Sequence, residues 1–276
     1  MDRYCVMGNP VDHSKSPWIH ARFAELTGEP VEYGKRLIAL DAFEPAVRAF
    51  IAEGGKGCNI TVPFKFQAAS LVNSRSERAA LAEACNILSF DGDRIHGDNT
   101  DGIGFVDDVE RNAGVKLAGL AVLLLGAGGA AAGVLGPVLQ AKPRRVVVAN
   151  RTVAKAEALV RRHAALAREQ GVELQAVALD AVGGTYDLVA NATASSLGGA
   201  AVPVDPRVLK PGALAYDMMY GPAAEGFLRW AREHGAVGRD GLGMLVEQAA
   251  EAFLAWRGIR PPSAQVLAEL RQELQG

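Results

Sequence analysis

Residues 121–139 read AVLLLGAGGAAAGVLGPVL, and this stretch indicates how the middle of the chain folds. Ala121 to Leu125 has the length of a buried strand, and Ala130 to Leu139 is long enough for a helix. The glycines between them permit a tight turn, bring the backbone close to a pyrophosphate and aim helix amides at negative charge. The pattern therefore predicts a dinucleotide-binding site, although an ordinary strand-to-helix turn is the alternative. The residues expected at the cofactor are Gly126, Ala127, Gly128, Gly129 and Ala130.

The next predicted strand, Arg145 to Ala149, bears on the choice of cofactor. An NAD enzyme places an acidic residue roughly 20 residues beyond the glycines, where it bonds the ribose 2′-hydroxyl. This chain has Asn150-Arg151-Thr152 there, with Lys155 one helical turn further on. A guanidinium matches a phosphate in two hydrogen bonds, so the pattern predicts NADP. The alternative is a helix start capped by Thr152 with solvated basic residues.

Short apolar runs alternate with longer amphipathic ones along the chain, which predicts an α/β protein with largely parallel sheets. A length of 276 residues favours two domains. We expect Ser16-Pro17 to open a helix, Asp41 and Glu44 to form a capping box, and Asp91-Gly92-Asp93 to turn a hairpin. Further strands are expected at 3–7, 31–40, 56–62, 187–191 and 213–217, a helix at 100–112 and two helices after Leu242.

The composition bears on partners and location. The 29 basic and 31 acidic residues are mixed along the chain and give a net charge of −2, so we expect neither nucleic acid nor a membrane surface as a partner. The N-terminus lacks the apolar run of a signal peptide, so we expect a cytoplasmic protein. Three scattered cysteines (Cys5, Cys58 and Cys85) predict small buried residues, and we expect no metal site.

Four polar clusters outside the glycine-rich region share one kind of chemistry. They are Ser14-Lys15-Ser16-Pro17, Asn59 to Pro63 with Lys65, Asn99 to Gly102, and Gln248. Each also has a plain explanation, as a helix start, a strand end, a turn or an exposed side chain. Together their hydroxyls, amides, lysine and aspartate suit a polyhydroxylated acid, and they follow predicted strand ends or lie in loops, where α/β enzymes bind ligands.

At these residues the chain closely resembles the shikimate dehydrogenase family. Six motifs carry the resemblance in the expected order over almost the whole chain: 8–10 with 13–17 (GNP and HSKSP), 59–65 (NITVPFK), 98–102 (DNTDG), 126–130 (GAGGA), 150–152 (NRT) and 240–248 (DGLGMLVEQ). The resemblance implies an N-terminal α/β substrate-binding catalytic domain, residues 1–101, completed by C-terminal helices at 239–276. Residues 102–238 would form a Rossmann-type NADP-binding domain.

The resemblance also implies an activity, the NADPH-dependent reversible reduction of 3-dehydroshikimate to shikimate in aromatic amino acid biosynthesis, by a monomer or homodimer. Lys65 and Asp101 would carry the proton chemistry, because the reduced ketone oxygen develops negative charge. Ser14 and Ser16 would hold the substrate carboxylate with help from Tyr220. The ring hydroxyls would be bonded by Asn59, Thr61, Asn86, Asp101 and Gln248. At the cofactor, the resemblance adds Thr193, Met218 and Gly241 to the glycines and to Asn150, Arg151, Thr152 and Lys155.

The sequence departs from the family pattern at several positions: Ile87 and Glu225 stand where threonine is common, Ala21 where asparagine is usual, and Ala194-Ser195-Ser196 lacks a glycine-methionine ending. These changes bear on affinity more than on reaction type, because Lys65 and Asp101 are retained. Two alternatives stay open, a quinate/shikimate dehydrogenase of broader specificity and a non-catalytic NADP-binding regulatory paralogue.

Overall fold

A computed structural model describes residues 1–193 and 202–275 and divides the chain into two compact units. Unit 1 comprises Met1–Gly104 together with Leu245–Gly276, and unit 2 comprises Phe105–Met244. Helices α5 (Asp101–Asp107) and α9 (Leu242–Arg257) carry the chain from one unit to the other. The departure noted at Ala194-Ser195-Ser196 lies outside the described residues.

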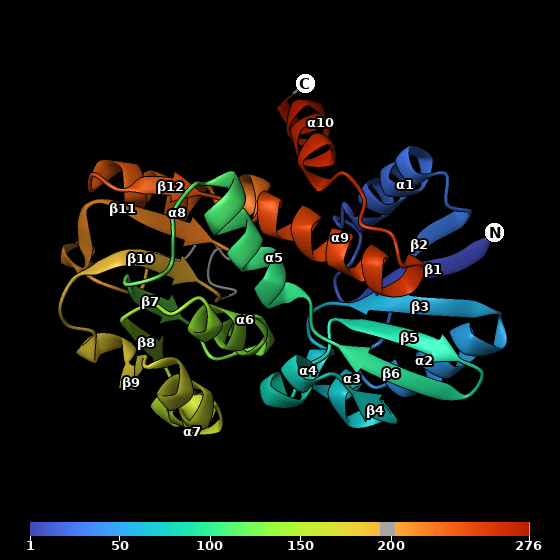
Figure 1. Cartoon of the computed structure of the whole chain (residues 1–276), viewed down its shortest axis with the longest axis horizontal. Helices are drawn as coiled ribbons and strands as arrows, with labels where there is room; N and C mark the ends of the chain where they lie inside the picture. Colours follow the sequence, from blue (N-terminus) through green and yellow to red (C-terminus); the bar gives the residue numbers. More distant parts are fainter. Residues whose placement is uncertain (194–201, 276) are drawn as a thin grey trace. The chain divides into compact units, whose positions relative to one another are not determined.

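Unit 1 is built on one mixed six-stranded sheet with the order β2-β1-β3-β5-β6-β4. Strand β1 pairs in parallel with β2 and β3, whereas β5 pairs antiparallel with β3 and β6. Helix α1 packs on β2, and α2 on β3 (Figure 1). The strands are β1 (Asp2–Gly8), β2 (Val31–Leu37), β3 (Gly55–Ile60), β4 (Ser74–Arg75), β5 (Ile87–Asp91) and β6 (Arg94–Asp98). The helices are α1 (Ser16–Thr27), α2 (Phe43–Ala52), α3 (Lys65–Leu71), α4 (Glu77–Ala82) and α10 (Ser263–Gln275), with most of α9.

Aromatic side chains from distant parts of the sequence fill the core of unit 1. Phe43 stacks on Phe64 with ring centroids 5.0 Å apart. Phe253 of α9 meets the edge of Phe23 at 5.7 Å, so the C-terminal segment completes the core that α1 begins. All three cysteines are buried and free, which confirms their predicted role as small buried residues.

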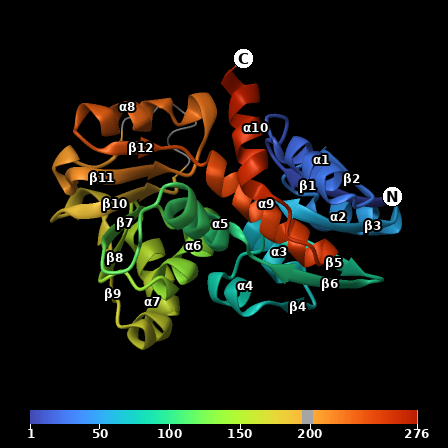
Figure 2. The ribbon, with the colours of Figure 1, turned by 45° about the horizontal axis from the view of Figure 1, so that its top comes forward.

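Unit 2 is a fully parallel sheet with the order β12-β11-β10-β7-β8-β9. This is the order of a doubly wound dinucleotide-binding sheet, and it confirms the predicted α/β class. Helices α6 and α7 cover one face and α8 the other (Figures 1 and 2). The strands are β7 (Ala121–Leu125), β8 (Arg145–Asn150), β9 (Glu173–Ala178), β10 (Tyr186–Asn191), β11 (Leu209–Asp217) and β12 (Val237–Arg239). The helices are α6 (Gly129–Gln140), α7 (Val153–Gln170) and α8 (Glu225–Glu233).

The predicted capping box is wrong, whereas the predicted opening of a helix at Ser16-Pro17 is confirmed. Ala42 is the N-cap of α2 and no side chain bonds there, so Asp41 and Glu44 form no capping box. At α1, Lys15 is the N-cap and Ser16 is the first helical residue, followed by Pro17. The predicted strand at 31–40 ends instead at Leu37, although the N–H of Ile38 still donates to the carbonyl of Gly8 at 3.1 Å.

A buried carboxylate ties the start of unit 2 to its sheet. Asp108 begins a π-helical turn (Asp108–Asn112) and its side chain is fully buried. It accepts hydrogen bonds from the Tyr216 hydroxyl at 2.7 Å and from Nε of Arg239 at 2.8 Å. A Cβ atom on Gly243 would lie 1.7 Å from the Asp108 Oδ1 atom, so only glycine fits in that first turn of α9. Asp108 therefore joins a helix, two strands and α9.

Two histidines are buried, and this gives the fold a pH dependence. Burial lowers the pKa of His163 to about 4 and that of His20 to about 3. An unfolded histidine has a pKa of about 6.5, so between pH 6.5 and 4 the unfolded chain binds protons that the folded chain does not. Stability therefore falls as the pH drops through this window, by up to about 1.4 kcal/mol per pH unit for each histidine.

Between pH 6.5 and 4.5, we expect the His163→Leu variant to lose about 2 kcal/mol less unfolding free energy than the wild type, because leucine cannot take up a proton. Urea unfolding at half-unit pH steps measures this slope. The exposed His234 serves as the control, and His234→Gln should leave the slope unchanged. An equal acid slope in wild type and His163→Leu would contradict this assignment.

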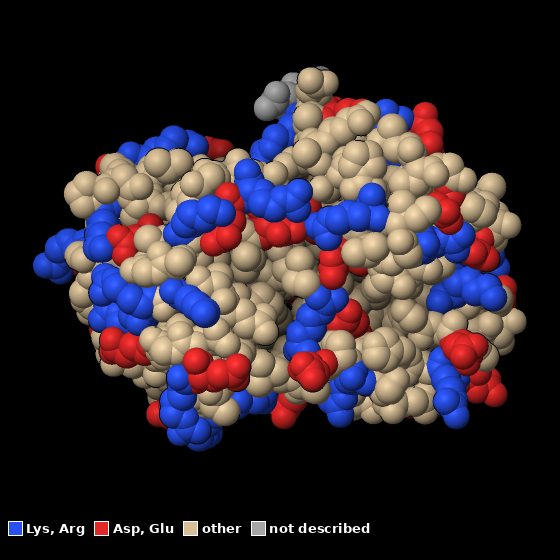
Figure 3. Space-filling view, in the orientation of Figure 1, with Lys and Arg blue, Asp and Glu red and all other residues tan. Residues whose placement is uncertain are grey.

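Lysines and arginines alternate with aspartates and glutamates over the face of the molecule drawn in Figure 3. Within residues 1–193 and 202–275, every helix is too short or too polar to cross a bilayer.

Candidate active site

An ion pair between Lys65 and Asp101 forms the centre of the candidate site in unit 1. Lys65 is the first residue of α3 and Asp101 the first residue of α5, so each side chain extends from the start of a helix. The Nζ atom of Lys65 donates to Oδ2 of Asp101. Only 14% of the lysine side chain and 6% of the aspartate side chain are exposed. The pair places a proton donor beside a carboxylate that orients it.

Amide groups surround this pair. The Asn86 Nδ2 atom lies 2.9 Å from Oδ1 of Asp101, 2.9 Å from the Thr100 hydroxyl and 3.2 Å from Oε1 of Gln248. Oδ1 of Asn86 accepts from the backbone N–H of Thr100 at 2.8 Å, which fixes which way the amide faces. Lys65, Asn86, Asp101 and Gln248 are thus brought together from α3, the start of β5, α5 and α9.

The turn that carries Asp101 is held by Asn99 and Asp98, which belong to the predicted segment 98–102, and by Arg78, which the sequence motifs did not indicate. Asn99 donates to the carbonyl of Ala84 at 2.8 Å and accepts from the N–H of Asp101 at 3.1 Å. Before it, Asp98 pairs with Arg78 through both carboxylate oxygens. Burial raises the pKa of Asp98, but the bonds from Arg78 and Ser76 outweigh burial and lower it overall. Arg78 carried no signal in the sequence because its partner lies 20 residues away.

The other predicted substrate residues of unit 1 follow strand ends or open a helix. The hydroxyls of Ser14 and Ser16 lie 3.2 Å apart at the start of α1. Asn59 lies near the end of β3 with 5% of its surface exposed, and Thr61 follows the strand. A Cβ on Gly8 would lie 2.3 Å from the Thr61 methyl group, so glycine at position 8 makes room for Thr61. Tyr220 belongs to unit 2, on the segment after β11.

The predicted cofactor residues lie along the carboxyl edge of the sheet in unit 2. Strand β7 pairs with β8 and β10, so the glycine turn has the ends of both neighbours beside it. Gly126 has a φ of +107°, and a Cβ there would lie 3.2 Å from the Thr193 side chain. The N–H of Gly241 donates to the carbonyl of Met219, next to Met218 at the end of β11. Residues from the ends of β7, β8, β10 and β11 therefore share one edge.

The geometry around Gly128 tests whether a pyrophosphate fits. Gly128 is the N-cap of α6, and no side chain caps the helix there. A Cβ on Gly128 would meet no protein atom within 4 Å, so the backbone is open on that side. Uncapped amides beside open space suit an anion.

The segment after β8 is open to a phosphate as well. Arg151, Thr152 and Lys155 are all exposed. Thr152 is the N-cap of α7 by position, but its side chain makes no cap hydrogen bond. Asn150 donates to the carbonyl of Thr152 at 2.9 Å and so shapes this turn. The Thr152 hydroxyl is thus free of the capping role in the alternative explanation, whereas the exposure of Arg151 and Lys155 fits both explanations.

Of the departures from the family pattern, Ile87 lies in the core, and Glu225 and Ala21 lie on the surface. Ile87 is 1% exposed at the start of β5, directly after Asn86, so the missing hydroxyl falls in the core. Glu225 is exposed at the start of α8 and pairs with Arg232. Ala21 is exposed on α1.

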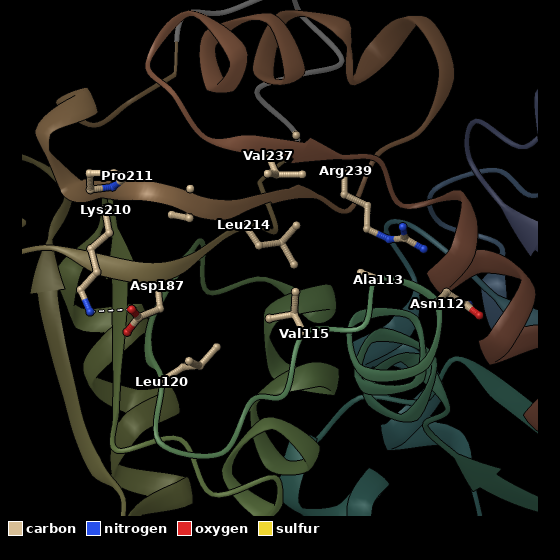
Figure 4. Close-up of a pocket in the computed structure, with 13 residues that line it drawn as sticks. Asn112, Ala113, Val115, Leu120, Asp187, Lys210, Pro211, Leu214, Val237 and Arg239 are labelled. Carbon is tan, nitrogen blue, oxygen red and sulfur yellow. Dashed lines mark hydrogen bonds and ion pairs between the residues drawn. The ribbon is translucent and has the colours of Figure 1, made fainter.

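A cavity of about 490 Å³ lies in unit 2, apart from the predicted site residues (Figure 4). The segment before β7 and the strands β11 and β12 line it, together with Lys210 and Asp187. Lys210 bonds Asp187, and Asp187 also accepts from the N–H of Ala121 at 2.8 Å. This charged pair is therefore satisfied within the protein.

Comparison with known proteins identifies the family. Residues 6–88 match the shikimate dehydrogenase substrate binding domain, residues 108–197 the shikimate / quinate 5-dehydrogenase family, and residues 241–271 the shikimate 5'-dehydrogenase C-terminal domain. A shikimate dehydrogenase (NADP(+)) of Acidovorax sp. (strain JS42) is 65% identical over 270 residues, which cover 98% of this chain and 96% of that protein.

Comparison with solved structures supports the same family. An Ael1 enzyme from Pseudomonas putida is 47% identical with a TM-score of 0.87, and 98% of each chain is covered. The shikimate 5-dehydrogenase of Thermus thermophilus, solved in complex with NADP(H) and shikimate, is 31% identical with a TM-score of 0.81 over 99% of each chain. The family expected from the sequence motifs is confirmed: this chain belongs to the shikimate dehydrogenase family.

Proposed function

We propose that this chain catalyses the reversible, NADP-dependent interconversion of 3-dehydroshikimate and shikimate. The observation that carries the proposal is the buried pair of Lys65 and Asp101 with Asn86 and Gln248 around it. The Acidovorax relative bears the name shikimate dehydrogenase (NADP(+)) and matches over nearly its whole length. Unit 1 is the proposed substrate-binding unit, and unit 2 the proposed NADP-binding unit.

In this proposal Lys65 is the group next to the reacting oxygen. NADPH, when bound, supplies the hydride. The Lys65 ammonium stabilises the negative charge that develops on the ketone oxygen and gives it a proton, and it takes the proton back in the reverse direction. Asp101 holds the lysine in place and accepts a hydrogen bond from a ring hydroxyl.

The remaining residues bind the substrate. Ser14 and Ser16 donate to the carboxylate, with Tyr220 as a helper. Asn59, Thr61, Asn86 and Gln248 bond the ring hydroxyls. Each of these side chains has a polar atom suited to a polyhydroxylated acid, and Asn59, Asn86 and Gln248 are at most 8% exposed, which favours a fixed geometry.

The cofactor proposal rests on the open Gly128 turn for the pyrophosphate and on Arg151 and Thr152 for the 2′-phosphate. The nicotinamide is expected to lie beside Thr193, Met218 and Gly241. These residues are on the same edge of the sheet. The NADP named for the Acidovorax and Thermus enzymes supports this assignment.

We expect Arg151→Ala to raise the Michaelis constant for NADPH about tenfold or more and to change that for NADH less than twofold. The reason is that charge-assisted bonds of about 1.5–3 kcal/mol reach only the 2′-phosphate. Initial rates with both cofactors measure this. Arg161→Ala is the matched control, since Arg161 is an exposed arginine of α7, the helix that follows Arg151. Equal efficiency with NADPH and NADH in the wild type would refute the assignment.

One assay tests the function itself. Purified protein is given NADP with shikimate or with quinate, and NADPH formation is followed by absorbance. We expect oxidation of shikimate at the higher kcat/KM. A comparable value for quinate would favour the broader quinate/shikimate dehydrogenase, which the matched shikimate / quinate family makes the second candidate. Binding of NADP without turnover of either acid would favour a regulatory paralogue.

A further inference from the structure

A tyrosine outside the predicted site bonds one of the proposed substrate residues. Tyr33 lies on the edge strand β2, and its hydroxyl donates to Oδ1 of Asn59 at 2.6 Å. Burial raises the pKa of Tyr33 well above its ordinary value, with the nearby Ser16 hydroxyl acting in the opposite direction. The phenol end of Tyr33 is therefore enclosed next to two residues of the proposed substrate set.

The hydrogen bond from Tyr33 is the shorter of the two that the Asn59 side chain makes. On its other side, Nδ2 of Asn59 donates to the carbonyl of Asn86 at 3.4 Å, near the limit for a hydrogen bond. A carbonyl only accepts, so the amide nitrogen must face Asn86 and the amide oxygen must face Tyr33. The phenol hydroxyl thus makes the shorter of the two hydrogen bonds that hold the Asn59 amide, and the buried His20 ring also interacts with the Asn59 side chain.

The ring of Tyr33 is itself fixed. The imidazole of His20 on α1 stacks on it with centroids 4.1 Å apart and planes within 4° of parallel. Trp256 of α9 lies on the same cluster, 6.4 Å from the Tyr33 ring. His20 is fully buried, so the stack cannot swing into solvent. Two helices thus hold the phenol in one place.

We infer that Tyr33 is a positioning residue for the proposed reaction: its hydroxyl orients the Asn59 amide so that the amide nitrogen bonds a ring hydroxyl of the substrate. The inference rests on the proposed function, because it concerns a residue assigned to the substrate there. Tyr33 acts through Asn59 and makes no contact with the reacting atoms.

The test is Tyr33→Phe, which removes the hydroxyl and keeps the ring. We expect the KM for shikimate to rise about tenfold, since a buried amide loses its donor. The kcat should stay within about twofold, because a hydroxyl contact away from the ketone stabilises ground state and transition state alike. The KM for NADP should not change. A purely structural role would lower stability without this separation of KM from kcat.

Tyr4→Phe is the matched control. Tyr4 belongs to the same aromatic cluster, stacked on Trp256 at 4.5 Å, and its hydroxyl lies 3.4 Å from Arg257 rather than near Asn59. This variant should leave both kinetic constants for shikimate within twofold. An equal rise in KM in Tyr4→Phe would overturn the inference, because it would show a general effect of the cluster.

A double-mutant cycle with Asn59→Ala decides whether Tyr33 acts through Asn59. In the Asn59→Ala background, Tyr33→Phe should change the KM for shikimate less than twofold. A full tenfold rise there, or an unchanged KM in the single variant, would overturn the inference while the wild-type kinetics still upheld the proposed function. If the wild type oxidised no shikimate, the proposed function would fail, and this inference with it.

Discussion

The Lys65→Ala variant should oxidise shikimate with a kcat lowered about 100-fold or more, while the Michaelis constants for shikimate and NADP stay within a small factor. Removal of a general acid–base group has effects of this size. Because the lysine acts in the chemical step, its loss appears in kcat rather than in binding. Steady-state rates at saturating NADP, with binding of shikimate measured separately by calorimetry, give both quantities.

Lys210→Ala is the control for this prediction, since Lys210 also pairs with a partly buried aspartate but lies at the cavity of unit 2. It should keep kcat within about twofold. Asp101→Asn should lose activity and also raise the KM for shikimate, because that carboxylate both orients Lys65 and accepts a substrate hydroxyl. Near-normal turnover by a folded Lys65→Ala protein would show that Lys65 has only a structural role.

Replacing Asp108 by alanine should lower the free energy of unfolding by about 3–5 kcal/mol, the scale for removing one partner of a buried ion pair. The variant leaves the Arg239 guanidinium and the Tyr216 hydroxyl without their acceptor. The hydrogen bonds to Asp108 are also the main reason that the pKa of Arg239 is raised. Urea denaturation followed by tryptophan fluorescence, to which Trp230 of unit 2 contributes, measures the change.

Glu225→Ala provides the comparison, because Glu225 pairs with Arg232 where both side chains are more than half exposed. Removing that surface pair should cost less than about 1 kcal/mol. A similar small loss in Asp108→Ala would mean that solvent reaches Arg239 and that the carboxylate does not anchor the sheet.

The strongly periodic segments of this fold, and the turns that contain glycine, were predictable from the sequence. The run AVLLL is buried at every position, and the hairpin at Gly92 has the positive φ that the turn requires. The edge strand β9 was missed because residues 173–178 are only partly buried and their alternation of polar and apolar residues stops after Ala176. The capping box failed because an acidic pair at the right spacing does not decide where a helix begins.

The candidate site was predictable only where residues sit in short motifs. Lys65 and Asp101 were singled out by the segments that carry them, although 36 residues separate them. Tyr33 and Arg78 lie outside any motif, and their partners Asn59 and Asp98 meet them only through sheet pairing and helix packing. The Asp108 cluster joins positions 131 residues apart, so periodicity could not indicate it.

The discontinuity of unit 1 governs the order in which the chain can fold as it leaves the ribosome. Residues 105–244 form one continuous unit, which can close before synthesis ends. The first 104 residues must wait for α9, because Phe253 packs on Phe23 and Gln248 bonds Asn86 only after residue 245 has emerged. The aromatic surface of α1 thus stays uncovered through most of translation, and a chain truncated before α9 would expose it to chaperones and proteases.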